Sequence, residues 1–309
     1  MNRIKILNAR RCVAVFMAML MMLLSLSYTG NMTDAANSRV QYYIYNAKTG
    51  VKTGEYYLDP VSTLNNSRGV IDEDDREVDW TKSGVVKLID NKIYVGEGSY
   101  RGSGFVVSDH VIATAAHCVY DYYRQKTQQL SKVLLFDANG NVTLEATPVQ
   151  VHIPVKFITS TQNAGNKYKM DSDYALITVK EDLSAYACFD LGMPLASFNS
   201  KNATVSASGF PERIKQNDEE IVVNTNNLHT MYTGNGQVLN GNDKFINHNS
   251  DTTSGNSGGP LYITESLNER TYYTAIAINI VESPDYNISY RMTTDLIHFY
   301  TGNNTNISW

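Results

Sequence analysis

The chain has 309 residues, of which 42% are hydrophobic and 18% charged, and its formal net charge is −5. This length is enough to bury the core of one large domain. Lys and Arg form no cluster outside the first residues, so nucleic acid is excluded as an expected partner. No group of Cys and His has metal-ligand spacing, and we therefore expect no metal and no cofactor.

The first 27 residues are typical of a secretory signal peptide. Four basic residues open the chain: Arg3, Lys5, Arg10 and Arg11. An apolar run follows over residues 13–26, and it is short for a membrane span, which needs ~20 residues. Cleavage fits after Ser27 or after Ala36, and a retained N-terminal anchor is the alternative. We therefore expect a secreted, extracellular protein that has no membrane attachment once the signal is removed.

Residues 28–69 form a separate polar segment. They are rich in Asn, Ser, Thr and Tyr and contain few large aliphatic side chains, so they are too polar to build a core alone. We interpret this segment as a propeptide that another protease releases near Arg68 and Gly69. The alternative is an ordered N-terminal extension that packs on the following domain.

Residues 70–309 show the pattern of an all-β domain. Short apolar runs lie between turns rich in Gly, Asn, Asp and Ser, at residues 85–88, 104–107, 132–136, 174–179, 204–208 and 272–280. Helical periodicity is rare. It is limited to the C-terminal stretch 294–300 and a short turn over residues 119–124. One two-barrel domain fits this length.

Three separated motifs carry the residues of a nucleophilic site. Ser257 lies in Gly-Asn-Ser-Gly-Gly-Pro, and His117 lies in Ala-Thr-Ala-Ala-His-Cys. Asp173 leads directly into an apolar strand-like run, where a carboxylate is shielded from water, whereas Asp171 lies one step further away. A serine hydroxyl is a weak nucleophile, which needs a nearby base held by a buried carboxylate. We predict that Ser257, His117 and Asp173 act together.

The order and contexts of these residues resemble the chymotrypsin-fold serine peptidases, and in particular their glutamyl-endopeptidase (V8-like) branch. Val70-Ile71, followed by Asp74-Asp75-Arg76, is similar to the mature N-terminus of that branch. Residues 102–107 and 112–121 are similar to its segments around the histidine. The resemblance implies two six-stranded antiparallel β-barrels and a short C-terminal helix. It also implies a monomeric endopeptidase that acts on proteins or peptides through an acyl-enzyme.

The same resemblance assigns further residues. The backbone N–H groups of Gly255 and Ser257 are expected to form the oxyanion hole. Thr252, Asn279 and the ammonium group of Val70 are expected to line the S1 pocket and to favour Glu or Asp at P1. Asn279 stands where the branch has a histidine, so it donates a hydrogen bond without a positive charge.

Several alternatives stay open at this point. Asp251 matches the position where trypsin-like enzymes keep an acid for Lys and Arg substrates. An HtrA-like protease is a further alternative, although the chain leaves no length for a PDZ-type module. A catalytically silent, toxin-like binding relative is the third. Cys12 leaves with the signal peptide, and we favour free thiols at Cys118 and Cys188 over a bond between them.

Overall fold

A computed structural model of the protein describes residues 40–58, 74–94, 97–186, 189–194, 203–216, 219–225, 227–267, 270–283 and 285–302. The expected signal peptide, Val70 and Cys188 therefore lie outside the described residues. None of the described helices is both long enough and apolar enough to cross a bilayer.

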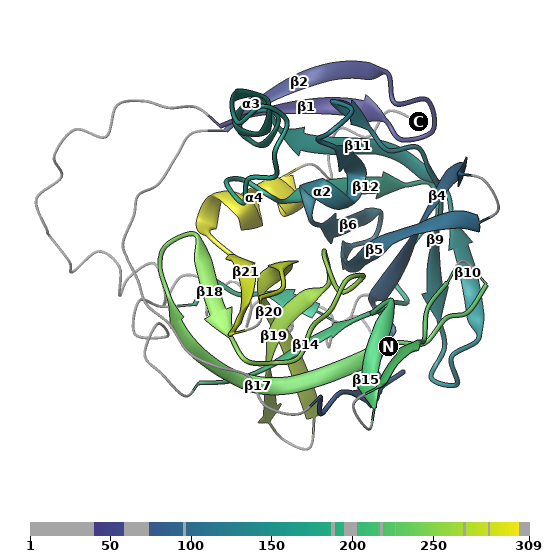
Figure 1. The fold of residues 1–309 in the computed structure, drawn as a ribbon, viewed down its shortest axis with the longest axis vertical. Coiled ribbons are helices and arrows are strands. Elements are labelled where there is room, and N and C mark those ends of the chain that lie inside the picture. The colour runs from purple at the N-terminus through teal and green to yellow at the C-terminus, as the bar shows by residue number, and fades with distance from the viewer. Residues whose placement is uncertain are drawn as a thin grey trace, which may run out of the picture. The chain divides into compact units, whose positions relative to one another are not determined.

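Nine strands form the first sheet, in the order β10-β9-β4-β5-β6-β12-β11-β1-β2. Their bounds are β1 Val40–Asn46, β2 Lys52–Leu58, β4 Val85–Tyr94, β5 Glu97–Ser108, β6 Val111–Thr114, β9 Leu130–Phe136, β10 Val142–Ala146, β11 Pro148–Pro154 and β12 Ala175–Val179. The six central strands, from β9 to β11 in this order, make the sheet of the first barrel. β10 extends the sheet at one end, and the β1–β2 hairpin extends it at the other (Figure 1).

The second sheet has the order β13-β20-β19-β14-β17-β18-β21. Its strands are β13 Phe189–Leu191, β14 Thr204–Gly209, β17 Tyr232–Gly241, β18 Phe245–His248, β19 Pro260–Leu267, β20 Arg270–Val281 and β21 Asn287–Arg291. β20 also pairs with β21, so six antiparallel strands close into a barrel, drawn in green and yellow in Figure 1. The all-β, two-barrel prediction is confirmed. One detail differs from it, because β13 pairs with β20 in parallel.

Short elements complete the fold. β3 Glu77–Val78 pairs with β17, and two small hairpins are formed by β7 Tyr120–Asp121 with β8 Lys126–Thr127 and by β15 Arg213–Gln216 with β16 Glu219–Val222. The helices are α2 Ala116–Val119, α3 Val155–Asn163 and α4 Thr294–Gly302. α4 agrees with the prediction, whereas the turn expected over residues 119–124 begins as α2, three residues earlier.

Helix α3 was not predicted from the sequence. Its stretch Val-Lys-Phe-Ile-Thr-Ser-Thr-Gln-Asn contains several β-branched residues, which have weak helix propensity. Phe157, Ile158 and Thr161 are nevertheless buried on one side of the helix. Tertiary packing therefore decides the conformation here, as it often does for short helices.

The β1–β2 hairpin lies within the segment that we interpreted as a propeptide. β1 pairs antiparallel with β11 over residues 42–46. Tyr42 is fully buried, its ring stacks on Phe299 of α4 at 4.2 Å between centroids, and its hydroxyl lies 3.0 Å from that of Tyr174. Burial of an aromatic side chain of this size contributes about 2–3 kcal/mol. This half of the segment is thus packed on the domain.

Candidate active site

His117 and Asp173 come from neighbouring parts of the first barrel and contact each other directly. His117 lies in α2, just after β6, and Asp173 lies two residues before β12, the strand that pairs with β6. The Nδ1 atom of His117 donates to Oδ2 of Asp173 at 2.7 Å, and its backbone N–H donates to Oδ1 at 2.9 Å. The Asp173 side chain is fully buried, whereas 21% of the His117 side chain is exposed.

A third donor completes the surroundings of this carboxylate. The hydroxyl of Tyr168 donates to Oδ2 of Asp173 at 2.5 Å, and its ring meets the His117 ring edge-on at 5.5 Å between centroids. Burial on its own lowers the pKa of His117, but the charge and hydrogen bond of Asp173, together with the neighbouring Cys118, outweigh it, so the pKa lies well above its usual value. Protonated His117 is therefore strongly stabilised.

The loop that carries Ser257 is fixed by residues of β5. The backbone N–H of Ser103 donates to the carbonyl of Ser257 at 2.8 Å, and the Ser103 hydroxyl donates to the carbonyl of Gly255 at 2.7 Å. Gly255 has φ +102° and Gly258 has φ +84°, conformations that favour glycine. A Cβ on Gly258 would lie 2.2 Å from the Ser103 carbonyl oxygen. The Gly-rich motif thus permits a sharp turn against a neighbouring strand.

His117 and Ser257 line one cavity of about 240 Å³. The other lining residues come from the loop before Ser257, from β20 and its end, and from two tyrosines: Thr252, Thr253, Ser254, Asn256, Asn279, Ile280, Val281, Glu282, Tyr122 and Tyr168. A concave site that joins a histidine bonded to a carboxylate with a serine hydroxyl can hold an acyl group next to a base.

The side chain of Asn279 is held by hydrogen bonds that run through Ser289 to His248. Its Oδ1 accepts from the hydroxyl of Ser289 at 2.8 Å, and Ser289 in turn lies 2.9 Å from Nε2 of His248. Burial lowers the pKa of His248 to about 3, so this ring is neutral and its Nε2–H donates to Ser289. Nδ2 of Asn279 donates one N–H to the carbonyl of Pro260 at 3.4 Å. Because Oδ1 is engaged as an acceptor, the second N–H of the amide is the group that could donate into the cavity that Asn279 lines.

Comparisons with known proteins give the family and the fold of this chain. The sequence model described as Trypsin matches residues 89–287. The chain belongs to the trypsin family. It is accordingly a serine endopeptidase. Among solved structures, a Glu endopeptidase in complex with MPD is similar, with a TM-score of 0.56 and 16% identity over 74% of this chain and 96% of that chain. At this identity the likeness concerns the fold alone. No curated protein matches the chain.

Within this trypsin-family domain, the other acids named from the sequence lie apart from the cavity lining. Asp171 pairs with Lys244 at 2.9 Å and with Lys156 at 3.1 Å. Oδ2 of Asp251 accepts from the backbone N–H of Asp75 at 3.0 Å, and burial raises the pKa of Asp251 to about 6. Thr252 does line the cavity. Val70 lies outside the described residues, so its expected place at S1 stays a prediction.

Two residues that line the cavity have no signal in the sequence. Tyr168 and Glu282 occupy segments without a motif. Their roles depend on which segments meet in the folded chain. For the cysteines, Cys118 is a buried free thiol, and its Sγ lies 3.4 Å from the Ser257 carbonyl oxygen.

Proposed function

We propose that this endopeptidase works through a Ser257-His117-Asp173 triad. Ser257 Oγ attacks the peptide carbonyl and gives its proton to Nε2 of His117, which passes it to the leaving amine. Water then hydrolyses the acyl-enzyme by the same route. The observation that carries the proposal is the double contact of Asp173 with the Nδ1 and backbone N–H of His117, a residue that shares its cavity with Ser257.

The Asp173 contact also sets the tautomer of His117. A proton held on Nδ1 by the carboxylate leaves Nε2 as the acceptor of the neutral ring, which is the state that a general base requires. The backbone N–H groups of Gly255 and Ser257 are the proposed oxyanion donors. Loss of one such donor typically lowers turnover by ~10²–10³.

Labelling with an organophosphonate tests this assignment, together with Ser257→Ala. We expect stoichiometric labelling of the processed wild-type protein and neither labelling nor peptide hydrolysis by Ser257→Ala. Hydrolysis that survives in Ser257→Ala would reject the triad. A processed wild-type protein that is neither labelled nor active would instead favour a catalytically silent relative.

We propose a preference for Glu or Asp at P1. A buried P1 carboxylate needs donors in place of water, and the Thr252 hydroxyl and the Asn279 amide supply them. A second preference, for Lys or Arg, is favoured by Glu282, an acidic residue that also lines the cavity. Hydrolysis of matched peptides that differ only in Glu, Gln, Lys or Phe at P1 separates the two. Equal rates for Glu and Gln would reject the acidic preference, and the fastest rate for Lys would establish the second.

We further propose that the protein is secreted as a monomeric zymogen. Residues 1–27 are the signal peptide, residues 28–69 the propeptide and residues 70–309 the peptidase domain. Cleavage by an activating protease before Val70 would then leave the β1–β2 hairpin bound to β11 without a covalent link, because Tyr42 is buried in the domain core.

N-terminal sequencing and intact mass of the secreted protein test this. We expect a second N-terminus at Val70 and a hairpin fragment that elutes with the domain. An uncut chain with full activity would favour the ordered extension.

A further inference from the structure

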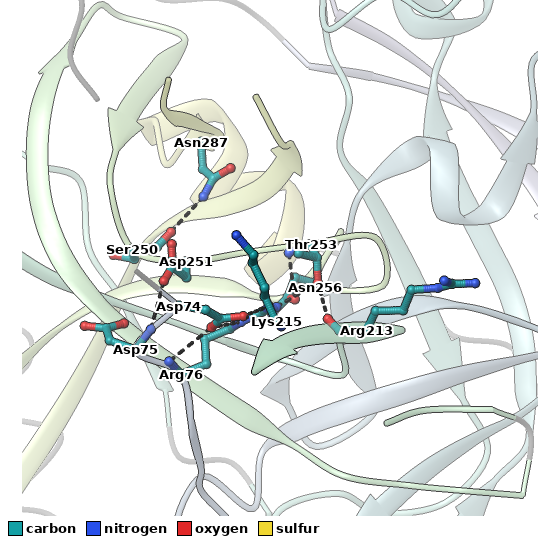
Figure 2. Close-up of polar contacts among 10 residues, drawn as sticks. All are labelled: Asp74, Asp75, Arg76, Arg213, Lys215, Ser250, Asp251, Thr253, Asn256 and Asn287. Atoms are coloured by element: carbon teal, nitrogen blue, oxygen red, sulfur yellow. Dashed lines mark hydrogen bonds and ion pairs between the residues drawn. The ribbon is translucent and has the colours of Figure 1, made fainter. Parts of the chain in front are cut away.

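Residues 74–76 lie against the loop that precedes Ser257, as Figure 2 shows. The backbone N–H of Asp75 donates to Oδ2 of Asp251 at 3.0 Å. On the other side, Oδ2 of Asp74 accepts from the backbone N–H of Lys215 at 2.7 Å. The short segment just after the expected cleavage site is therefore tied to two separate parts of the second barrel.

Arg76 is the centre of this contact. Its side chain is 2% exposed, and it forms a bidentate ion pair with Asp74, with Nε to Oδ1 at 2.8 Å and Nη2 to Oδ2 at 2.5 Å. Burial raises the pKa of Asp74, but the bonds from Arg76 and from the backbone N–H of Lys215 together outweigh it, and the net change in pKa is downward. The remaining guanidinium nitrogen, Nη1, donates to Oγ1 of Thr253 at 2.7 Å. A buried guanidinium is stable when a carboxylate balances its charge and its N–H groups are hydrogen-bonded. Asp74 and Thr253 provide both for Arg76.

Thr253 links this ion pair to the residue before the nucleophile. Its hydroxyl accepts from Arg76 and donates to the carbonyl of Arg213 at 2.7 Å. Its backbone N–H donates to Oδ1 of Asn256 at 3.2 Å, and the N–H of Asn256 donates to the Thr253 carbonyl at 2.9 Å (Figure 2). Asn256 is buried and directly precedes Ser257, and Thr253 and Asn256 both line the cavity.

We propose that Arg76 is a positioning residue of the active site, which holds the loop 251–256 through Thr253 in the conformation that Ser257 requires. The proposal rests on the Ser257-His117-Asp173 triad proposed above. Asn256, the residue before the nucleophile, carries no charge and so cannot hold the loop through an ion pair of its own. In this proposal the internal residue Arg76 holds the loop instead. Because Arg76 follows Val70 closely in sequence, the segment whose N-terminus processing would free also carries this support.

The test uses the processed protein and the variants Arg76→Gln and Thr253→Val. Arg76→Gln removes the charge and the fork, whereas Thr253→Val keeps the Arg76–Asp74 pair and removes only the hydroxyl. A misplacement of ~1 Å costs up to ~10²-fold in rate. We therefore expect each variant to lower kcat for a peptide substrate, and the rate of labelling by a small organophosphonate, by ~10–10²-fold. The small probe has no P1 side chain, so its labelling rate reports the loop and not the specificity pocket.

The double variant and a control make the result specific. If Arg76 acts through Thr253, the double variant is no slower than the slower single variant, since both changes break one chain of contacts. Lys132→Gln breaks the exposed Lys132–Glu145 pair at 2.7 Å and should leave both rates unchanged.

The outcomes separate the inference from the function on which it rests. A lower unfolding temperature with unchanged kcat and labelling in Arg76→Gln would overturn the inference and leave a purely structural ion pair. Should Arg76→Gln fail to fold, wild-type kcat in Thr253→Val would overturn it equally. A wild-type protein that is inactive and unlabelled contradicts the proposed function itself.

Discussion

Tyr168→Phe tests how the carboxylate sets the basicity of His117. The change removes one hydroxyl and keeps the ring that packs against His117. Asp173 then loses the bond from Tyr168 and keeps only the two donated by His117. More of the carboxylate's charge is left for the imidazolium, so the pKa of His117 rises further above its usual value.

The size of the effect follows from the number of donors. A hydrogen bond to a charged group contributes about 1.5–3 kcal/mol. If about a third of this free energy is transferred to the His117 pair, the gain is about 0.5–1 kcal/mol, or ~0.4–0.7 pH units. Activity requires neutral His117, so the acid limb of kcat/KM should move to higher pH by this amount, while the alkaline plateau changes little.

The assay is the pH dependence of kcat/KM, which reports the free enzyme. Tyr122→Phe is the matched control, because Tyr122 lines the same cavity and its ring contacts Tyr168 at 5.6 Å between centroids. Its acid limb should match that of the wild type. An unchanged limb in Tyr168→Phe, or one moved to lower pH, would refute the reasoning.

Three further predictions concern folding and stability. Gly258 has φ +84°, and Gly258→Ala would place a Cβ 2.2 Å from both the Ser103 carbonyl oxygen and the Thr114 hydroxyl oxygen. We therefore expect a loss of about 3 kcal/mol or more in the free energy of unfolding, measured in urea. Wild-type stability of the variant would contradict this. Tyr42→Ala should lower the free energy of unfolding in urea by about 3–5 kcal/mol. A loss below about 1 kcal/mol would show that the hairpin is not part of the core. Burial lowers the pKa of Lys87 to about 7, so the folded state loses this proton before the unfolded state does. Wild-type stability relative to Lys87→Met should therefore rise between about pH 7 and 10, by up to ~1.4 kcal/mol per unit, and a parallel pH dependence of the two would contradict this.

The sequence was sufficient for the features that local chemistry determines. Gly255 and Gly258 signal a sharp turn around Ser257, and the apolar run after Asp173 signals a buried strand entrance. Both hold because each depends on a few adjacent residues. The family and the all-β fold follow from the same motifs.

Features that depend on long-range packing were not accessible in this way. The β1–β2 hairpin belongs to a segment with few large aliphatic residues, yet Tyr42 packs against Tyr174, just before β12, and Phe299 of α4, both far away in sequence. Likewise, Tyr168 lies in a segment without a motif, and only the folded chain brings it to Asp173. Arg76 follows the motif at Val70, but its contact with Thr253 is also visible only in the folded chain. Helix α3 forms against its own weak propensity because Phe157 is buried.

The buried thiol of Cys118, next to Ser257, has a consequence for how the enzyme responds to reducing and oxidising agents. Cys118 faces Gly102 of β5, where a Cβ would lie 2.8 Å from its Sγ, so no covalent bridge joins the two segments. Reducing agents therefore have nothing to cut at this point. Oxidants have little access as well, because Cys118 is 1% exposed and oxidation of a thiol requires exposure. An added oxygen would also have to fit where the sulfur lies 3.4 Å from the Ser257 carbonyl oxygen. Peroxide should therefore reach this sulfur only after the chain unfolds.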